Sequence, residues 1–198
     1  MKEKVSGKEK ILEAALNLVM KRGGADITMA QIARAADMSR QAVYLHFADR
    51  GELFVAMVRY ADEKRGLEHE IRLIREAPTG LEAMRRMVSL QARSNPQIWP
   101  AARTLDAVRR TDPEIERSWQ DRLQHRLAGC RDIMRRVKHD GDLIPGMDVD
   151  TAADLLWTLT SLRMWEDLVV LRGWSAKRYE EHVNALLLRA LTRYDPKP

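Results

Sequence analysis

Apolar residues recur three or four positions apart along the whole of this 198-residue chain, and no alternating strand pattern persists. Residues that cap helix starts stand before these segments, and three of them, Ser6, Asp49 and Thr79, are followed three positions later by a glutamate. Other candidate caps are Asn95 before Pro96, Asp112 before Pro113, Asp148 and Ser175. The chain is therefore predicted to be all-α.

About nine helices are predicted from this spacing. Two short ones lie within residues 28–47, and the others cover residues 8–21, 50–75, 81–94, 96–110, 113–139, 149–172 and 176–193. We expect the Gly23-Gly24 pair to end the first helix. The segment Ala77-Pro78-Thr79-Gly80 is expected to end the long helix that starts after Asp49.

Composition indicates a globular protein, since 45% of the residues are hydrophobic. No run of about 18 apolar residues is present to span a membrane, and the charged start from Met1 to Lys10 does not resemble a signal peptide. We therefore expect a cytoplasmic protein with no membrane partner.

The residues that enzymes and metal sites require do not form a recognisable pattern. No Gly-rich phosphate loop or nucleophile elbow is found, and the single cysteine, Cys130, is expected in the core. Asp121 and His125 share a helix face, but two ligands without a third favour a solvated pair over a metal site. The sequence predicts no catalytic residue, no metal and no cofactor.

Residues 28–47, TMAQIARAADMSRQAVYLHF, predict two short helices joined by a tight turn at Asp37-Met38. Thr28 and Gln31 form a capping box for the first helix. Its apolar face consists of Ile32, Ala33 and Ala36, where the alanines allow another helix to cross closely. This is the pattern of a DNA-reading helix-turn-helix.

The second helix of this pair starts after Ser39, and Val43 and Phe47, four residues apart, face inward. The outward side chains are those of Arg40, Gln41, Ala42, Tyr44 and His46. Arg and Gln match the edges of guanine and adenine in the major groove, and Ala suits a thymine methyl group. Ser39, Tyr44 and His46 are expected at phosphates. The alternative is that this set is only the solvated face of a small helix.

Net charge is +5, and residues 1–60 carry 10 Lys or Arg against 7 Asp or Glu. This modest excess favours a polyanion through counterion release, although many proteins that bind no nucleic acid are equally basic. Lys2, Lys4, Lys8 and Lys10 form either a loose arm that contacts phosphates or, more commonly, a solubilising tail.

Residues from Lys8 to about Tyr60 resemble the N-terminal domain of the tetracycline-repressor (TetR) family of transcriptional regulators. The resemblance implies that the third helix enters the major groove, with Thr28 and Arg50 contacting phosphates at the starts of the second and fourth helices. Two departures stand out. Asp37 stands where the family usually has Gly in the turn, and Gly51 where it more often carries a better helix former.

Because the helix predicted over 50–75 is long for a globular helix, we place a functional boundary inside it, near residues 60–65. The predicted domains are residues 1–62, the helix-turn-helix DNA-binding domain, and residues 63–198, a helical domain to which the resemblance assigns effector binding and dimerisation. The helix over 50–75 is long enough to link the two and is the expected lever. Wide, polarizable side chains on several helices of the second domain are candidates for an effector pocket or for ordinary core: Met84, Met87, Trp99, Trp119, Met134, Trp157 and Met164. Arg103, Arg163 and Asp167 are candidates to orient a polar ligand group or to form surface ion pairs.

The last two predicted helices are apolar on more than one face, which requires two burial partners. A second copy of the chain would cover the outer face, and the resemblance implies the same pairing. The candidate dimer residues are Trp157, Thr160, Met164, Leu168, Val183, Leu187 and Leu191.

The leading hypothesis is a ligand-responsive repressor: a homodimer that binds a palindromic double-stranded DNA operator and is released by a small-molecule effector. The alternative is a helical small-molecule-binding protein without sequence-specific DNA binding, supported by Asp37 and Gly51. A DNA-organising protein without an effector is a third possibility, which weak, salt-sensitive binding to any duplex would distinguish. The sequence does not separate a repressor from an activator.

Overall fold

A computed structural model describes residues 6–22 and 27–193. Within these ranges the chain is all-α, as predicted, and apart from the helices it forms one isolated bridge between Leu143 and Thr192. The predicted stop at Gly23-Gly24 and the predicted arm residues Lys2 and Lys4 lie outside the described residues. The elements in chain order are α1 (Gly7–Arg22), α2 (Met29–Ala35), α3 (Arg40–Tyr44), α4 (Arg50–Lys64), α5 (Leu67–Arg75), α6 (Gly80–Val108), α7 (Pro113–His139), α8 (Val149–Leu159), α9 (Leu162–Trp165), the π-helix η1 (Glu166–Leu171) and α10 (Ala176–Leu191).

The chain packs as two compact units. The N-terminal unit contains the described residues up to 68 together with 100–121, and the C-terminal unit contains 69–99 together with those from 122 onward. Helices α6 and α7 therefore contribute residues to both units. By packing, the segment 100–121 joins the helix-turn-helix region, while the division at residues 62 and 63 remains a prediction about function.

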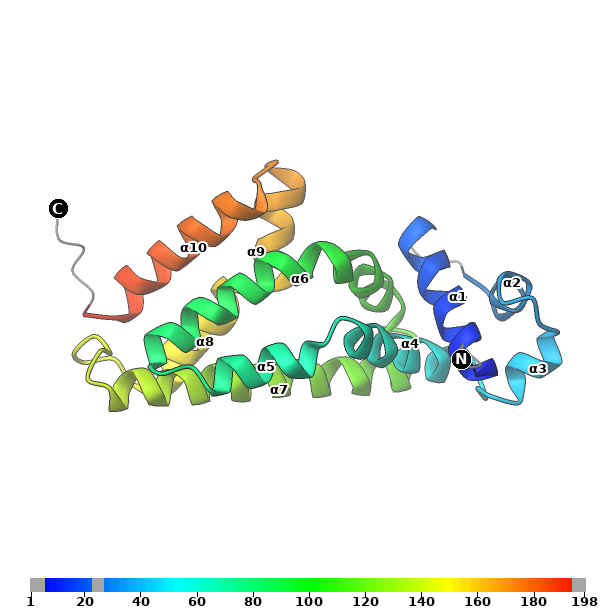
Figure 1. Ribbon diagram of the computed structural model, residues 1–198, viewed down its shortest axis with the longest axis horizontal. Coiled ribbons are helices and arrows are strands. Elements are labelled where there is room, and N and C mark those ends of the chain that lie inside the picture. The colour runs from blue at the N-terminus through cyan, green and yellow to red at the C-terminus, as the bar shows by residue number, and fades with distance from the viewer. Residues whose placement is uncertain (1–5, 23–26, 194–198) are drawn as a thin grey trace, which may run out of the picture. The chain divides into compact units, whose positions relative to one another are not determined.

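The core of the N-terminal unit is formed by α1 to α4 and by the segment 100–121. Ile11 and Val19 of α1, Ile32 of α2, Val43 of α3 and Phe54 of α4 are all fully buried in it. The later segment adds apolar side chains to the same cluster, namely Ala101, Leu105, Val108 and Ile115. Figure 1 shows α2 and α3 meeting at a short turn. Their exposed sides are therefore held by a single core.

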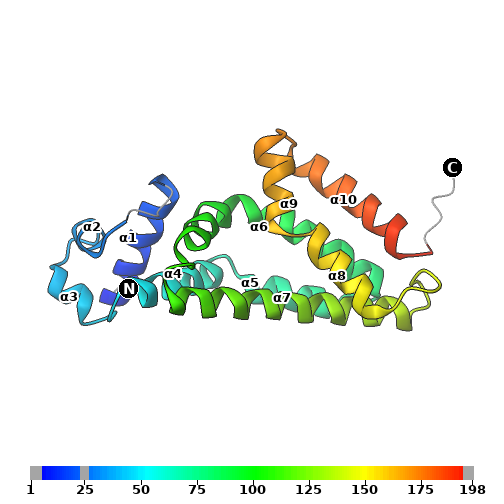
Figure 2. The same cartoon turned by 180° about the vertical axis from the view of Figure 1, so that it is seen from behind.

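The C-terminal unit is built around buried apolar residues from α6, α7, α8, α9 and α10. Cys130 is fully buried among them, and burial raises the pKa of its thiol to about 11. Figure 2 shows α9 continuing from α8 before α10 turns back, and α8 and α10 contact each other. The predicted core position of Cys130 is confirmed.

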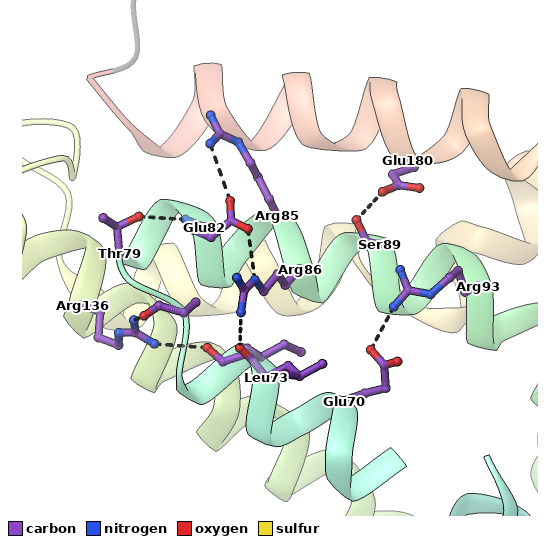
Figure 3. Close-up of polar contacts among 12 residues, drawn as sticks. Glu70, Leu73, Thr79, Glu82, Arg85, Arg86, Ser89, Arg93, Arg136 and Glu180 are labelled. Atoms are coloured by element: carbon purple, nitrogen blue, oxygen red, sulfur yellow. Dashed lines mark hydrogen bonds and ion pairs between the residues drawn. The ribbon is translucent and has the colours of Figure 1, made fainter. Parts of the chain in front are cut away.

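Polar contacts join α6 to its neighbours in this unit (Figure 3). Arg93 forms a 2.9 Å ion pair with Glu70 of α5, and Ser89 donates a hydrogen bond to Glu180 of α10. Arg86 donates to the carbonyl of Leu73 at 2.7 Å. Helix α6 is thereby fixed to α5 on one side and to α10 on another.

Three predicted helix bounds are corrected by the structure. The helix expected over 50–75 ends at Lys64, because Gly66 takes a φ of 65°, which interrupts the helix before α5. The helices expected over 81–94 and 96–110 form the single helix α6, which continues through Pro96. The helix expected over 149–172 breaks at Thr160, whose hydroxyl donates to the Leu156 carbonyl at 2.6 Å. Among the described residues, no helix is long and apolar enough to cross a membrane.

Candidate nucleic-acid interface and effector site

Helix α2 and the turn after it have the geometry that the sequence predicts. The backbone N–H of Gln31 donates to the Thr28 hydroxyl at 3.3 Å, and the N–H of Thr28 donates to the Gln31 side chain at 2.8 Å. Asp37 takes a φ of 55°, the left-handed conformation that glycine usually supplies. The turn therefore forms with Asp37 in place of glycine.

Helix α3 is fixed by one cap and by two buried side chains. The N–H of Ala42 donates to the Ser39 hydroxyl at 3.1 Å. Val43 and Phe47 are buried in the core of the N-terminal unit. The predicted outward residues are at the surface: Arg40, Gln41, Tyr44 and His46 are exposed and Ala42 is half-buried.

Arg40 and Tyr44 form a pair on the exposed side of α3. The guanidinium lies 5.4 Å from the centre of the Tyr44 ring, and its Nη2 donates to the Tyr44 hydroxyl at 3.3 Å. This hydrogen bond raises the pKa of Arg40, so the side chain stays charged. The pair presents a cation at the start of α3 and a phenol at its end, both on the exposed side of the helix.

The predicted phosphate contacts have different surroundings. Thr28 is exposed, whereas Arg50 is half-buried, donates to the Ile27 carbonyl at 3.5 Å and lies 5.6 Å from the Phe54 ring. His46 lies next to the start of α1, since a Cβ on Gly7 would come within 3.1 Å of its Nε2. Arg50 and His46 therefore lie at the surface and also contact other residues of the N-terminal unit.

An open groove of about 520 Å³ lies between α2 and α3. Its lining includes the exposed Arg34, which sequence reasoning missed, and Arg40, together with Ala30, Ala33, Asp37, Met38 and Ser39. Arg34 sits in the last turn of α2. The signal that could have identified Arg34 is a basic residue on the outer side of α2, because both helices of a helix-turn-helix contact phosphates.

Gly51, the second departure from the family pattern, is buried in the first turn of α4. A Cβ at this position would lie 2.7 Å from Oδ2 of Asp112. That carboxylate accepts hydrogen bonds from the N–H groups of Glu114 and Ile115 at the start of α7. Glycine at position 51 therefore leaves room for the cap of α7.

The structure brings together six of the seven predicted effector-pocket residues. Met84, Met87 and Met134 are buried in the core of the C-terminal unit, and Trp99, Trp157 and Met164 pack against it. Trp119 instead packs in the cluster of the N-terminal unit, 5.5 Å below the Arg109 guanidinium. Trp119 is therefore not part of the same group.

The polar ligand candidates form surface contacts. Arg163 and Asp167 make an ion pair at 3.4 Å, and Arg163 is largely exposed, as is Arg103. Sequence reasoning missed four polar residues of this unit, the buried Asn95, Trp165 and Tyr179 and the half-buried Arg126. Asn95 is predicted as a helix cap, but it lies inside the longer helix α6. Only its place on the apolar face of that helix would have identified it as a buried polar residue.

The predicted dimer residues fall into two groups. Thr160, Val183, Leu187 and Leu191 are buried within their own chain, so these four do not form an exposed face. Trp157, Met164 and Leu168 are half-buried. The large apolar residues exposed on α8, η1 and α10 are Leu155, Val170, Leu171 and Leu186. Side chains on the opposite side of α10 from the predicted ones are thus available to a partner.

Asp121 and His125 are both exposed. Across residues 6–22 and 27–193, no group of three or more His, Cys, Asp or Glu side chains is arranged to hold a metal ion. The candidate sites are therefore the exposed side of α3 and the mostly apolar core of the C-terminal unit.

Comparison with known proteins agrees with this geometry. The sequence profile of the family described as "Bacterial regulatory proteins, tetR family" matches residues 11–57, which include α2, the turn and α3. The HTH-type transcriptional repressor Rv1474c of Mycobacterium tuberculosis is 30% identical over 133 residues, which are 66% of this chain and 66% of that protein.

Solved structures share the fold over nearly the whole chain. A transcriptional regulator from Saccharomonospora viridis in complex with choline superposes with a TM-score of 0.81 at 19% identity, covering 94% of this chain and 98% of that one. FadR from Bacillus subtilis in complex with stearoyl-CoA superposes with a TM-score of 0.71 at 19% identity, covering 90% and 96%. From the helix-turn-helix geometry, the matching profile and the related repressor, this chain belongs to the tetR family of DNA-binding bacterial regulatory proteins, which are not enzymes.

Proposed function

We propose that this protein is a transcriptional repressor that binds a palindromic DNA operator as a homodimer and is released by a small-molecule effector. The observation that carries the proposal is the exposed start of α3, where Arg40 and Gln41 follow the Ser39 cap. Both are side chains whose donors match purine edges in the major groove. Ser39, Tyr44 and His46, with Thr28 and Arg50, are the proposed phosphate contacts, and Ala42 is the proposed neighbour of a thymine methyl group.

An effector is supported by the core of the C-terminal unit and by two structural neighbours. Methionine and tryptophan side chains from α6, α7, α8 and α9 meet there, and such side chains suit flat or hydrophobic ligands. The neighbour from Saccharomonospora viridis was solved with choline and FadR with stearoyl-CoA. Since these ligands differ in chemistry, they support ligand binding in this unit without fixing the ligand.

Release of the operator requires a connection between the ligand and α3. The predicted lever, one helix over 50–75, is interrupted at Gly66. Helices α6 and α7 each contribute residues to both units, and Leu105 and Ile115 belong to the same core as Val43 of α3. We propose that an effector acts on the reading heads through α6 and α7, since half-sites must match the spacing of a dimer.

The proposed homodimer is formed through α8 and α10. Leu155 of α8 and Leu186 of α10 are exposed apolar side chains on two helices that contact each other. Exposed leucines on adjacent helices are the surface that a second copy covers in helical dimers. Two copies would present two α3 helices to one operator.

The experiment that tests this function is capture of sheared DNA from the source genome by the purified protein at near-physiological salt, followed by footprinting of the enriched fragments. A protected inverted repeat is expected, with two half-sites about 10 base pairs apart or a multiple of that distance. Enrichment no greater than that of random fragments would contradict the proposal and favour a ligand-binding protein that does not read DNA sequence.

Asp37 and Gly51, the two residues that supported a ligand-binding protein without sequence-specific DNA binding, do not support that alternative in the structure. Asp37 adopts the backbone conformation that the turn requires, and Gly51 has a packing reason of its own beside Asp112. Neither departure distorts α3. We therefore favour the DNA-binding function.

A further inference from the structure

Several buried polar atoms in the core of the C-terminal unit have no hydrogen-bond partner in the described part of the chain. Asn95 is 0% exposed, and neither atom of its side-chain amide is paired. The Tyr179 hydroxyl and the Trp165 indole N–H are unpaired in side chains that are 0% and 3% exposed. Buried polar groups without partners are rare in native proteins, because each loses its hydration without compensation.

These residues come from three helices and belong to one region. The rings of Trp165 on α9 and Trp99 on α6 lie 6.4 Å apart, centre to centre. Asn95 precedes Trp99 by one helical turn and therefore lies on the same face of α6. Tyr179 of α10 belongs with Trp165 to the same buried cluster. The unpaired atoms of Asn95, Trp165 and Tyr179 thus belong to the core of this unit.

A half-buried cation, Arg126, lies beside Tyr179 in this unit. Arg126 of α7 donates to the Thr160 hydroxyl at 3.0 Å and to the carbonyls of Thr160 and Trp157 at the end of α8. Within the described residues it has no acidic ion-pair partner. Desolvation lowers its pKa, and Tyr179 lies close enough to Arg126 for the two groups to interact electrostatically. The region therefore holds a guanidinium that donates to neutral oxygens rather than to a carboxylate of the described chain.

Backbone irregularities flank this cluster on two sides. Pro96 and Pro100 follow Asn95 inside α6, and a proline lacks the N–H that the carbonyl four residues earlier would accept. Trp165 is the last residue before the π-helix η1, a form that occurs frequently at functional sites. The π-helix and the two prolines therefore lie next to the residues whose polar atoms are unpaired.

Resting on the proposed function, we infer that the effector is a carboxylate with an apolar or aromatic body, hydrogen-bonded by Asn95, Trp165 and Tyr179 and stabilised by the charge of Arg126. An indole N–H can only donate, and a phenol and an amide nitrogen also donate. The site is therefore rich in donors and suits an acceptor oxygen. Trp99 and Trp165 supply aromatic surface for the body of the ligand. A cationic ligand is disfavoured by the positive charge of Arg126.

The first test measures stability of the full-length protein without ligand. Asn95→Leu and Tyr179→Phe remove polar atoms that have no partner, so the free energy of unfolding is expected to stay the same or to rise. Tyr60→Phe is the matched control, because the Tyr60 hydroxyl donates to Glu13 at 2.9 Å and its loss is expected to lower stability. Lower stability of Asn95→Leu and Tyr179→Phe would show that internal water pairs these atoms and would overturn the inference.

The second test measures binding to the same proteins by titration calorimetry, without DNA. The probes are indole-3-acetate and octanoate, each beside the alcohol and the ammonium compound with the same body. At least one carboxylate is expected to bind about tenfold more tightly than its two analogues, and Asn95→Leu and Tyr179→Phe are expected to weaken it about tenfold. Tyr60→Phe is expected to bind it as the parent does.

Any one of three results would overturn the inference: no binding of either carboxylate, tighter binding of the ammonium compounds than of the carboxylates, or carboxylate binding that Asn95→Leu and Tyr179→Phe do not change. The readout is independent of DNA. A protein that binds the carboxylate but enriches no operator would contradict the proposed function alone, and one that protects an operator but binds no carboxylate would contradict only this inference.

Discussion

At the scale of single residues, two glycines mark places where other groups approach a helix start too closely for a side chain. A Cβ on Gly80 would lie 2.3 Å from the backbone nitrogen of Val137, and a Cβ on Gly51 would lie 2.7 Å from Asp112 Oδ2. The nitrogen of Val137 belongs to the backbone of α7 and cannot move without the rest of that helix. The side chain of Asp112 is held in place by the N–H groups it caps.

Gly51→Ala is therefore expected to destabilise the protein by about 1 to 2 kcal/mol, because the new Cβ displaces Asp112 from its capping position. In an Asp112→Ala background the same change is expected to stabilise by a few tenths to about 1 kcal/mol, since alanine is the better helix former. Urea unfolding of the four proteins measures both effects. Equal effects of Gly51→Ala in the two backgrounds would contradict this explanation.

At the scale of the helices, starts were more predictable than breaks. Thr28, Ser39, Asp49, Asp148 and Ser175 all cap helices as predicted, because capping depends on residues a few positions apart. The breaks at Gly66 and Thr160 have local causes that the predicted long helices passed over, whereas the continuation of α6 through Pro96 depends on packing against other helices. Local sequence does not contain that information.

The candidate sites divide in the same way. The outward residues of α3 follow from the spacing of Val43 and Phe47 within one short helix, and their exposure could be predicted. The cluster of Asn95, Trp165 and Tyr179 assembles from three helices far apart in sequence. Which of their faces is buried depends on the tertiary structure, so these residues were missed.

The start of α6 is expected to weaken in acid. The N–H of Gly80 donates to the Asp140 carboxylate at 2.7 Å, and this hydrogen bond is the main reason that the pKa of Asp140 lies below its ordinary value. A carboxylate with a lowered pKa stabilises the fold above its ordinary pKa and loses that effect as the pH falls through the lowered value. Stability is therefore expected to fall between about pH 5 and pH 3.

Asp140→Asn is expected to reduce this acid dependence, measured as the free energy of urea unfolding at several pH values. Asp154→Asn, at an exposed position on α8, is the matched control and should keep the dependence of the parent. If Asp140→Asn and the parent lost stability in parallel, the hydrogen bond at Gly80 would not be its source.

At the scale of the whole molecule, reading a palindromic operator requires two copies of the chain. In sedimentation experiments the parent protein is expected to be a dimer, and the double variant Leu155→Glu/Leu186→Glu a folded monomer, because two buried carboxylates would oppose the interface. Met20→Glu changes an exposed apolar residue of α1 and should remain a dimer. A parent monomer, or a double variant that still dimerises, would contradict the proposed interface.

Whether α3 reads the DNA sequence is decided by the affinity of one double variant for the footprinted operator. Arg40→Ala/Gln41→Ala is expected to lose about 100-fold or more in affinity for the operator, with much less effect on random DNA, because base contacts carry the selectivity. Arg163→Ala, which removes an exposed arginine of the C-terminal unit, should bind as the parent does. If the double variant bound the operator as tightly and as selectively as the parent, α3 would not be the reading helix.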